Sequence, residues 1–225
     1  MNHKSTVETL NRFLFEGYGI GFFTHVLNHF AREIELGIYS ISPVQDIGMI
    51  ATKGMTLKEY LDIISSQRYS AILYDYSIIS IECQIKNGKI IRHRYIYIPC
   101  PLKKEIIAGR PDEIEVADFL SQIDKSALET KILSQGYLRF DFTSDTPPDG
   151  VYHPKSHLTF ISSDCRIGLK APLSIAEFLT FIFDNFYPKN AIFWHDFQPH
   201  LKSTCSDTIL DEETSRMHLY WMESA

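Results

Sequence analysis

The chain has 225 residues, of which 44% are hydrophobic, 22% are charged and 13% are aromatic. A chain of this length and composition can bury enough apolar surface to fold without disulfides or a metal, and it argues against long disordered stretches. The formal net charge of −6 at pH 7 argues against a protein that coats nucleic acid with its whole surface.

The N-terminus and the cysteines indicate the compartment. No apolar core of about 7–15 residues marks a signal peptide, and no window approaches the roughly 20 apolar residues of a membrane span. The four cysteines lie far apart with no Cys-x-x-Cys pair: Cys83, Cys100, Cys165 and Cys205. This spacing argues against a zinc ribbon and a secreted disulfide scaffold. The sequence therefore predicts a cytoplasmic protein that does not interact with a membrane.

Helices are predicted near the N-terminus. Capping boxes, in which Ser or Thr is followed three residues later by Glu, stand at residues 5–8 and 56–59. The first begins a helix, and the second begins another that extends to about residue 66. Apolar residues at helical spacing predict a further helix over residues 22–35, with its histidines on the polar edge.

From residue 69 the hydrophobic period changes to two, which is typical of β-strands. Strands are predicted in five segments: 69–74, 78–85, 90–98, 137–143 and 156–161. The remaining elements are predicted as a helix over 112–123, a capped helix over 174–187 and an edge strand over 217–222.

This element order indicates the α+β class, because helices are followed by a meander of strands and then by helices. We expect an antiparallel sheet with helices packed on one face. The chain is divided into an N-terminal helical segment (1–66), a sheet-plus-helix core (67–190) and a C-terminal extension (191–225), all within one compact domain.

The turn at residues 86–88 fixes the register of one predicted hairpin. A two-residue Asn-Gly loop with regular pairing would oppose charged and apolar side chains, so we expect a three-residue loop that pairs Glu82 with Arg92 and Cys83 with Ile91. The second strand would then carry Arg92 and Arg94 on its polar face and His93, Tyr95 and Tyr97 on its apolar face.

Ionisable side chains gather in two consecutive strands. Arg139 and Asp141 alternate with apolar residues in one strand, and His157 stands near the start of the next. Strands joined by a loop pair antiparallel by default, so Asp141 is expected beside His157. His153 lies just before the second strand and Arg166 just beyond it.

These residue types fit metal-independent phosphodiester cleavage. Imidazole is the usual acid–base group near neutral pH, and an aspartate can orient it and hold its tautomer. Arginine binds phosphate through two parallel hydrogen bonds. The candidate catalytic residues are His157 as acid or base, Asp141 as its orienter and His153 as its assistant, with Arg139 and Arg166 holding phosphate.

A basic stripe between Lys86 and Arg110 contains seven basic residues and one acidic residue. Within it, Arg92, Arg94 and Lys103 are predicted to attract a nucleic-acid backbone. A solvated face without a partner is the alternative interpretation.

Two alternatives to the catalytic site stay open. In the first, Asp141 forms a structural ion pair with Arg139 or Arg166, and the histidines cap a loop stiffened by Pro154. In the second, zinc is bound by His153, His157 and Cys165, and either His195 or Cys205 is the fourth ligand. Otherwise no cofactor is predicted.

Several stretches resemble a bacterial family, domain of unknown function 2290. They are residues 68–77 (RYSAILYDYS), 93–101 (HRYIYIPCP), 153–158 (HPKSHL), 165–167 (CRI) and 172–174 (PLS). The likeness extends over about residues 69–187, and the HPKSHL stretch is its most specific part. The resemblance implies a family but no reaction.

The order of motifs also resembles the TumE-type bacterial toxins. The motifs in question are Asp75-Tyr76-Ser77, Arg139-Phe140-Asp141, His153-Pro154-x-x-His157 and Pro172-Leu173-Ser174. This chain is longer than the toxins, and its two histidines stand four apart where theirs are adjacent. The resemblance implies a toxin–antitoxin or phage-defence setting.

The sequence thus predicts a bacterial defence or toxin-type protein that acts on nucleic acid or nucleotides, with a protein partner from the same operon. The alternative is a non-catalytic interaction module that regulates a neighbouring defence enzyme. Salt-dependent binding without product formation would distinguish the second function from the first.

Overall fold

A computed structural model describes residues 2–43, 56–102, 136–145, 153–160, 165–189, 191–203, 205–216 and 218–220, with the single residues 109, 118, 119 and 122. Its helices are α1 (His3–Gly19), α2 (Leu57–Ser65), α6 (Ile175–Phe186), the 3-10 helix η3 (Ala191–Trp194), α7 (Gln198–Leu201) and α8 (Asp211–Thr214). Its strands are β1 (Phe23–Val26), β2 (Phe30–Glu35), β3 (Ile38–Ser42), β4 (Ala71–Leu73), β5 (Ile78–Lys86), β6 (Lys89–Ile98), β7 (Leu138–Thr143), β8 (Ser156–Phe160), β9 (Arg166–Leu169) and β10 (His218–Leu219).

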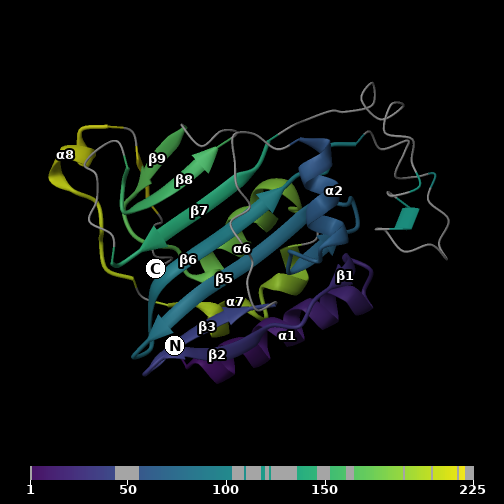
Figure 1. Cartoon of the computed structure of the whole chain (residues 1–225), viewed down its shortest axis with the longest axis horizontal. Helices are drawn as coiled ribbons and strands as arrows, with labels where there is room; N and C mark the ends of the chain where they lie inside the picture. The colour runs from purple at the N-terminus through teal and green to yellow at the C-terminus, as the bar shows by residue number, and fades with distance from the viewer. Residues whose placement is uncertain are drawn as a thin grey trace.

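The strands form one sheet in the order β1-β4-β5-β6-β7-β8-β9-β10 (Figure 1). Beyond β5 the sheet divides, because β4 pairs with the beginning of β5 and β3 pairs with its end, with β2 outside β3. All pairs are antiparallel except β9 with β10, and β4 to β9 form a meander. The α+β class and the antiparallel meander are therefore confirmed.

The larger hydrophobic core lies between one face of the sheet and α1, α6 and α7. The strands contribute alternate residues to it, including Ile79, Ile81, Tyr95, Phe140 and Leu158. The helices contribute Leu10, Phe13, Phe178, Phe183 and Leu201. Figure 1 shows these helices behind the sheet. We call this side of the sheet the core face.

A second core lies on the opposite face, where α2 packs near one end of the strands. Its buried residues include Tyr60, Ile63, Ile78, Ile96 and Tyr137. The expectation that the helices pack on one face is therefore wrong for α2. The reason is that the beginning of β5 and the end of β6, which pair with each other, carry apolar residues on both faces of the sheet. Both faces therefore need a cover there. We call the remainder of this second side the polar face.

The predicted helix over residues 22–35 is wrong, because β1 and β2 lie there and pair with β4 and β3. A β-bulge between Phe23 and His25 interrupts the period-two pattern, and the resulting apolar spacing imitates a helix. His29 is buried, with Nε2 3.2 Å from the Ile81 carbonyl oxygen, rather than at a polar helix edge. The segment 1–66 thus contributes strands as well as helices.

The predicted register of the β5–β6 hairpin is also wrong. The loop has two residues, Asn87 and Gly88, both with positive φ, between the pair Lys86 and Lys89. A bulge between Gln84 and Ile85 then shifts the pairing, so that Glu82 opposes Arg94 and Cys83 opposes His93. Like the longer loop that was expected, the bulge keeps charged and polar side chains opposite one another and the side chains of the apolar face opposite one another. The predicted faces of Arg92, Arg94, His93, Tyr95 and Tyr97 are therefore as expected.

Two of the three capping boxes are confirmed, at Thr56 with Glu59 and at Ser174 with Glu177. Helix α1 begins earlier than expected, because Asn2 caps it. The predicted helix over 112–123 lies largely outside the described residues. The predicted edge strand is short and lies parallel to β9. In the part of the chain that the structure describes, no helix is both long and apolar enough to cross a bilayer.

Gly17 is expected to resist substitution. A Cβ atom there would stand 2.5 Å from two carbons of the Phe23 ring, which is buried in the core. Gly17→Ala should lower the free energy of unfolding by about 1–3 kcal/mol through overpacking. Gly19→Ala in the same helix turn is the matched control, because a Cβ there meets nothing within 4 Å. Urea unfolding measures both, and equal values for the two variants would contradict the packing explanation.

Candidate functional site

The candidate site is centred on Asp141, in the middle of the polar face. The strand registers pair Asp141 with Arg94 on β6 and with His157 on β8. Residues that oppose each other on paired strands point to the same side of a sheet. The predicted antiparallel neighbourhood of Asp141 and His157 is therefore present.

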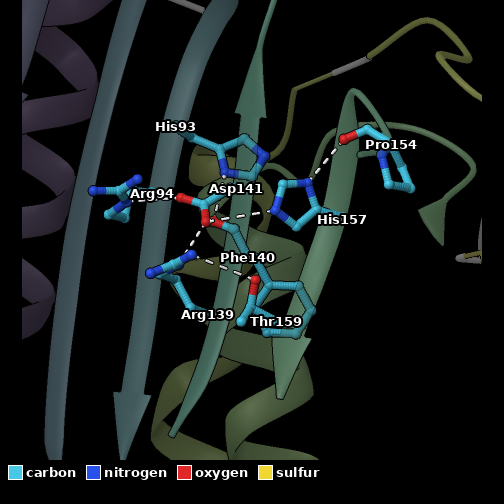
Figure 2. A network of polar contacts seen from close by, with 8 residues as sticks. All are labelled: His93, Arg94, Arg139, Phe140, Asp141, Pro154, His157 and Thr159. Atoms are coloured by element: carbon cyan, nitrogen blue, oxygen red, sulfur yellow. Dashed lines mark hydrogen bonds and ion pairs between the residues drawn. The ribbon is translucent and has the colours of Figure 1, made fainter. Parts of the chain in front are cut away.

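Asp141 holds this site together through both of its carboxylate oxygens (Figure 2). Arg94 Nε donates to Oδ1 at 2.7 Å, and Arg139 Nε donates to Oδ2 at 2.5 Å. Burial raises the pKa of Asp141, but the Arg94 and Arg139 guanidinium groups outweigh it, so the net pKa is lowered. Asp141 is therefore ionised at neutral pH.

His157 is oriented by the carbonyl group of Pro154 rather than by Asp141. Its Nδ1 lies 2.8 Å from the Pro154 oxygen, whereas its Nε2 lies 3.8 Å from Asp141 Oδ2, which is too long for a hydrogen bond. Because a carbonyl oxygen only accepts, Nδ1 carries the proton in the neutral ring and Nε2 carries the lone pair. Figure 2 shows Pro154 and Asp141 on opposite sides of the ring.

Burial lowers the pKa of His157 to about 4, although the Asp141 carboxylate and the Pro154 carbonyl group raise it. The imidazole is therefore neutral at pH 7. In this state it can accept a proton at Nε2, and the negative charge of a ligand beside it would make it a stronger base.

The polar face carries more positive than negative charge. Arg92 and Arg94 on β6, Arg139 on β7 and Arg166 on β9 all point to this side, against a single carboxylate on these strands, Asp141. Glu82 on β5 lies next to Arg94 and balances part of the charge. Arg139 is buried and its Nη2 reaches Thr159 Oγ1 at 3.5 Å, so it is held in place from two sides. Such a surface favours an anionic ligand.

The other predicted site residues lie at different distances from this centre. The exposed His153 ring stands 5.1 Å from the His157 ring, measured between centroids. Arg166 pairs across the strands with Thr159 and lies at the edge of the cluster. Arg92 is exposed on the same face, where it pairs with Thr143 beside the pair formed by Arg94 and Asp141. Lys103 lies outside the described residues.

Three contributors were missed by sequence reasoning. Thr159 could have been found from its position two residues after His157 on the same strand face. The Pro154 carbonyl oxygen has no side-chain signature. His93, on the core face behind the site, accepts a hydrogen bond from the Leu173 backbone N–H at Nε2, at 3.2 Å, and its Nδ1 lies 3.2 Å from the Phe140 oxygen.

The alternative zinc site does not assemble. Among the described residues, no three His, Cys, Asp or Glu side chains lie close enough to hold one metal ion. His195 follows η3, whose Trp194 is buried in the core on the other side of the sheet from His157. The structural ion pair, in contrast, is present between Asp141 and Arg139.

A family model described as an uncharacterized conserved protein, DUF2290, matches residues 29–221. The chain belongs to this family. The match includes Arg94, Arg139, Asp141, His157 and Arg166, so the whole candidate site lies inside the region that defines DUF2290. No curated protein and no solved structure matches the chain. The likeness to the TumE-type toxins stays a prediction.

Proposed function

We propose that this DUF2290 protein binds the phosphate groups of a nucleic acid or nucleotide on its polar face. The observation that carries the proposal is the excess of arginines over carboxylates on β6 to β9. One aspartate already holds Arg94 and Arg139 in fixed positions, so their remaining N–H groups are preorganised. A phosphate supplies several acceptor oxygens and the negative charge that these groups lack.

The proposed reaction is metal-independent cleavage of an RNA phosphodiester. His157 Nε2 accepts the proton of a ribose 2′-hydroxyl group, and the freed oxygen attacks the neighbouring phosphorus. The bond from phosphorus to the 5′ oxygen breaks, and that oxygen leaves with a proton from His153. The neutral state of His157 and the closeness of the His153 ring support these roles.

The proposed setting is a bacterial defence system or toxin–antitoxin pair, in which the chain has a protein partner. It is supported by the order of the Arg-x-Asp strand, the His-Pro segment and the Pro-x-Ser helix start, which resembles the TumE-type toxins. In this setting, overproduction of the chain alone should arrest growth.

A non-catalytic binding module is the second candidate function. It is favoured by the enclosure of the site, because the His157 side chain is 5% exposed and both oxygens of Asp141 are already engaged. A network of this kind can fix a binding surface for a partner without breaking any bond.

The central test measures cleavage of a labelled single-stranded RNA in the presence of EDTA. The His157→Gln variant should lose about 10²–10⁴-fold in cleavage rate, the range expected for one general base, and should retain RNA binding. Loss of growth arrest in cells producing this variant should accompany the loss of cleavage. Wild-type binding without any product would contradict catalysis and support the binding module.

Salt dependence of the same binding tests the phosphate contacts. Arg92→Ala should reduce the slope of log K against log salt by about 0.7, as expected for one phosphate contact on a single strand. Arg12→Ala is the matched control, because Arg12 is another exposed arginine but lies on α1, which packs against the core face. Equal slopes for both variants would remove the polar face from the binding surface.

A further inference from the structure

A row of polar side chains crosses the polar face at the end of the strands that lies away from α2. Each member opposes the next on paired strands, so all of them point to the same side of the sheet. In order across β2, β3, β5, β6 and β7, they are Arg32, Ser40, Gln84, Arg92 and Thr143. We call them the edge row. Helix α2 covers the other ends of β5 and β6, and every member of the edge row is half-buried or exposed.

The edge row adjoins the candidate site. Arg92 lies two residues before Arg94 on β6, so both point to the same face, and Thr143 bears the same relation to Asp141 on β7. Figure 1 shows β2 and β3 on the other side of β5 and β6 from β8. From β8, which carries His157, strand β2 is five strand spacings away, or about 24 Å at about 4.8 Å each. Stacked bases of one strand are about 3.4 Å apart, so a ligand that touches both places spans several nucleotides.

An exposed aromatic ring stands beside the far end of the edge row. Phe30 lies two residues before Arg32 on β2, on the same face of the sheet, and is 50% exposed. The guanidinium carbon of Arg32 lies 5.8 Å from the centroid of the Phe30 ring, which is a cation–π contact. Aromatic rings and guanidinium planes on open strands are the groups on which unpaired bases stack. The two side chains therefore offer a flat, positively charged surface to one base.

The charge at this end of the polar face favours a polyanion. The charged members of the edge row are both arginines, Arg32 and Arg92. The next row toward the β5–β6 turn carries the exposed Lys86 and Lys89 against one carboxylate, that of Glu35. The two rows thus hold four positive charges and one negative charge. A nucleic-acid strand supplies a negative charge at every phosphate and a flat ring at every base, whereas an acidic peptide supplies the charge alone.

We propose that Phe30 and the edge row form a subsite for single-stranded RNA, an inference that rests on the proposed function. One unpaired base stacks on the Phe30 ring, and the phosphates next to it lie along Arg32 and Arg92 toward the candidate site. A base inside a duplex is already stacked and paired, so the subsite favours a single strand. Every base has a flat face, so the subsite adds affinity without a preference for sequence.

The test measures, by fluorescence anisotropy, how the full chain binds two labelled strands of equal length. Both are 2′-O-methylated, which blocks attack by the 2′-hydroxyl group. One carries adenine at every position, and the other has the same sugar–phosphate backbone without bases. Phe30→Leu retains apolar bulk but has no ring, so it should weaken binding of the adenine strand by about 5–150-fold, the range expected for one lost stacked base. Its binding of the base-free strand should match that of the wild type.

Phe30→Tyr retains the ring and should bind both strands as the wild type does. Phe15→Leu is the matched control, because Phe15 is 51% exposed but lies on α1, which packs against the core face. If Phe30→Leu binds the adenine strand as tightly as the wild type, or weakens on both strands equally, the stacking subsite is overturned and the phosphate site is left intact. An adenine–uracil duplex that the wild type binds as tightly as the adenine strand would overturn the preference for single strands. If the wild type binds neither strand, the proposed function itself fails, and the subsite fails with it.

Discussion

Replacing Asp141 by Asn is expected to lower the free energy of unfolding by about 3–5 kcal/mol at pH 7, because it removes one partner of a buried ion network. The change leaves the guanidinium groups of Arg94 and Arg139 without the carboxylate that each contacts, and Arg139 is buried. Urea unfolding followed by circular dichroism measures the loss.

Asp207→Asn is the matched control for Asp141→Asn. Asp207 also forms an ion pair, with Lys170, but both side chains are about half exposed, so its loss should be below about 1 kcal/mol. A similarly small loss for Asp141→Asn would show that the network contributes nothing beyond a surface pair. In the wild type, the net pKa of Asp141 is lowered, so its contribution is present above the unfolded value of 3.8 and is lost as the pH falls through the folded value.

The free energy of unfolding is also expected to decrease as the pH is lowered from 6.5 to about 4. Burial lowers the pKa values of His29, His93 and His157 from 6.5 to about 4. Between these values the unfolded chain binds protons that the folded chain excludes, so acid favours unfolding. Each histidine should contribute about 3 kcal/mol of loss, which is complete below the folded pKa.

Urea midpoints at a series of pH values measure this loss. The His157→Gln variant should show a clearly smaller decrease in the free energy of unfolding between pH 6.5 and 4 than the wild type. The variant lacks one of the three buried histidines, and the other two still contribute. A free energy of unfolding that stays flat over this interval would contradict the burial of neutral histidines.

Local patterns were sufficient to predict the centre of the candidate site. The alternation of Arg139 and Asp141 with apolar neighbours assigned both side chains to one face, and the loop connection to the next strand predicted that Asp141 lies beside His157. Strand alternation is a local property with a fixed period, so a single sequence contains it.

The features that sequence reasoning missed depend on contacts between distant segments or on single inserted residues. The bulge between Gln84 and Ile85 changes the register without a characteristic residue type. The segment 22–35 becomes strands because β4 and β3 offer partners there. Glu213 and His218 reach Arg166 only through the parallel pairing of β10 with β9, which no local pattern reveals.

His93 and Arg94 are consecutive residues of β6, and they attach this strand to two different parts of the molecule. His93 accepts the N–H of Leu173 just before α6, while Arg94 donates to Asp141 on the opposite side of the sheet. Any sliding of β6 toward a ligand would break both attachments together. Hydrogen bonds on both faces therefore fix the position of β6 and the spacing of its arginines. Under the proposed function, that fixed spacing would select among anions by their dimensions.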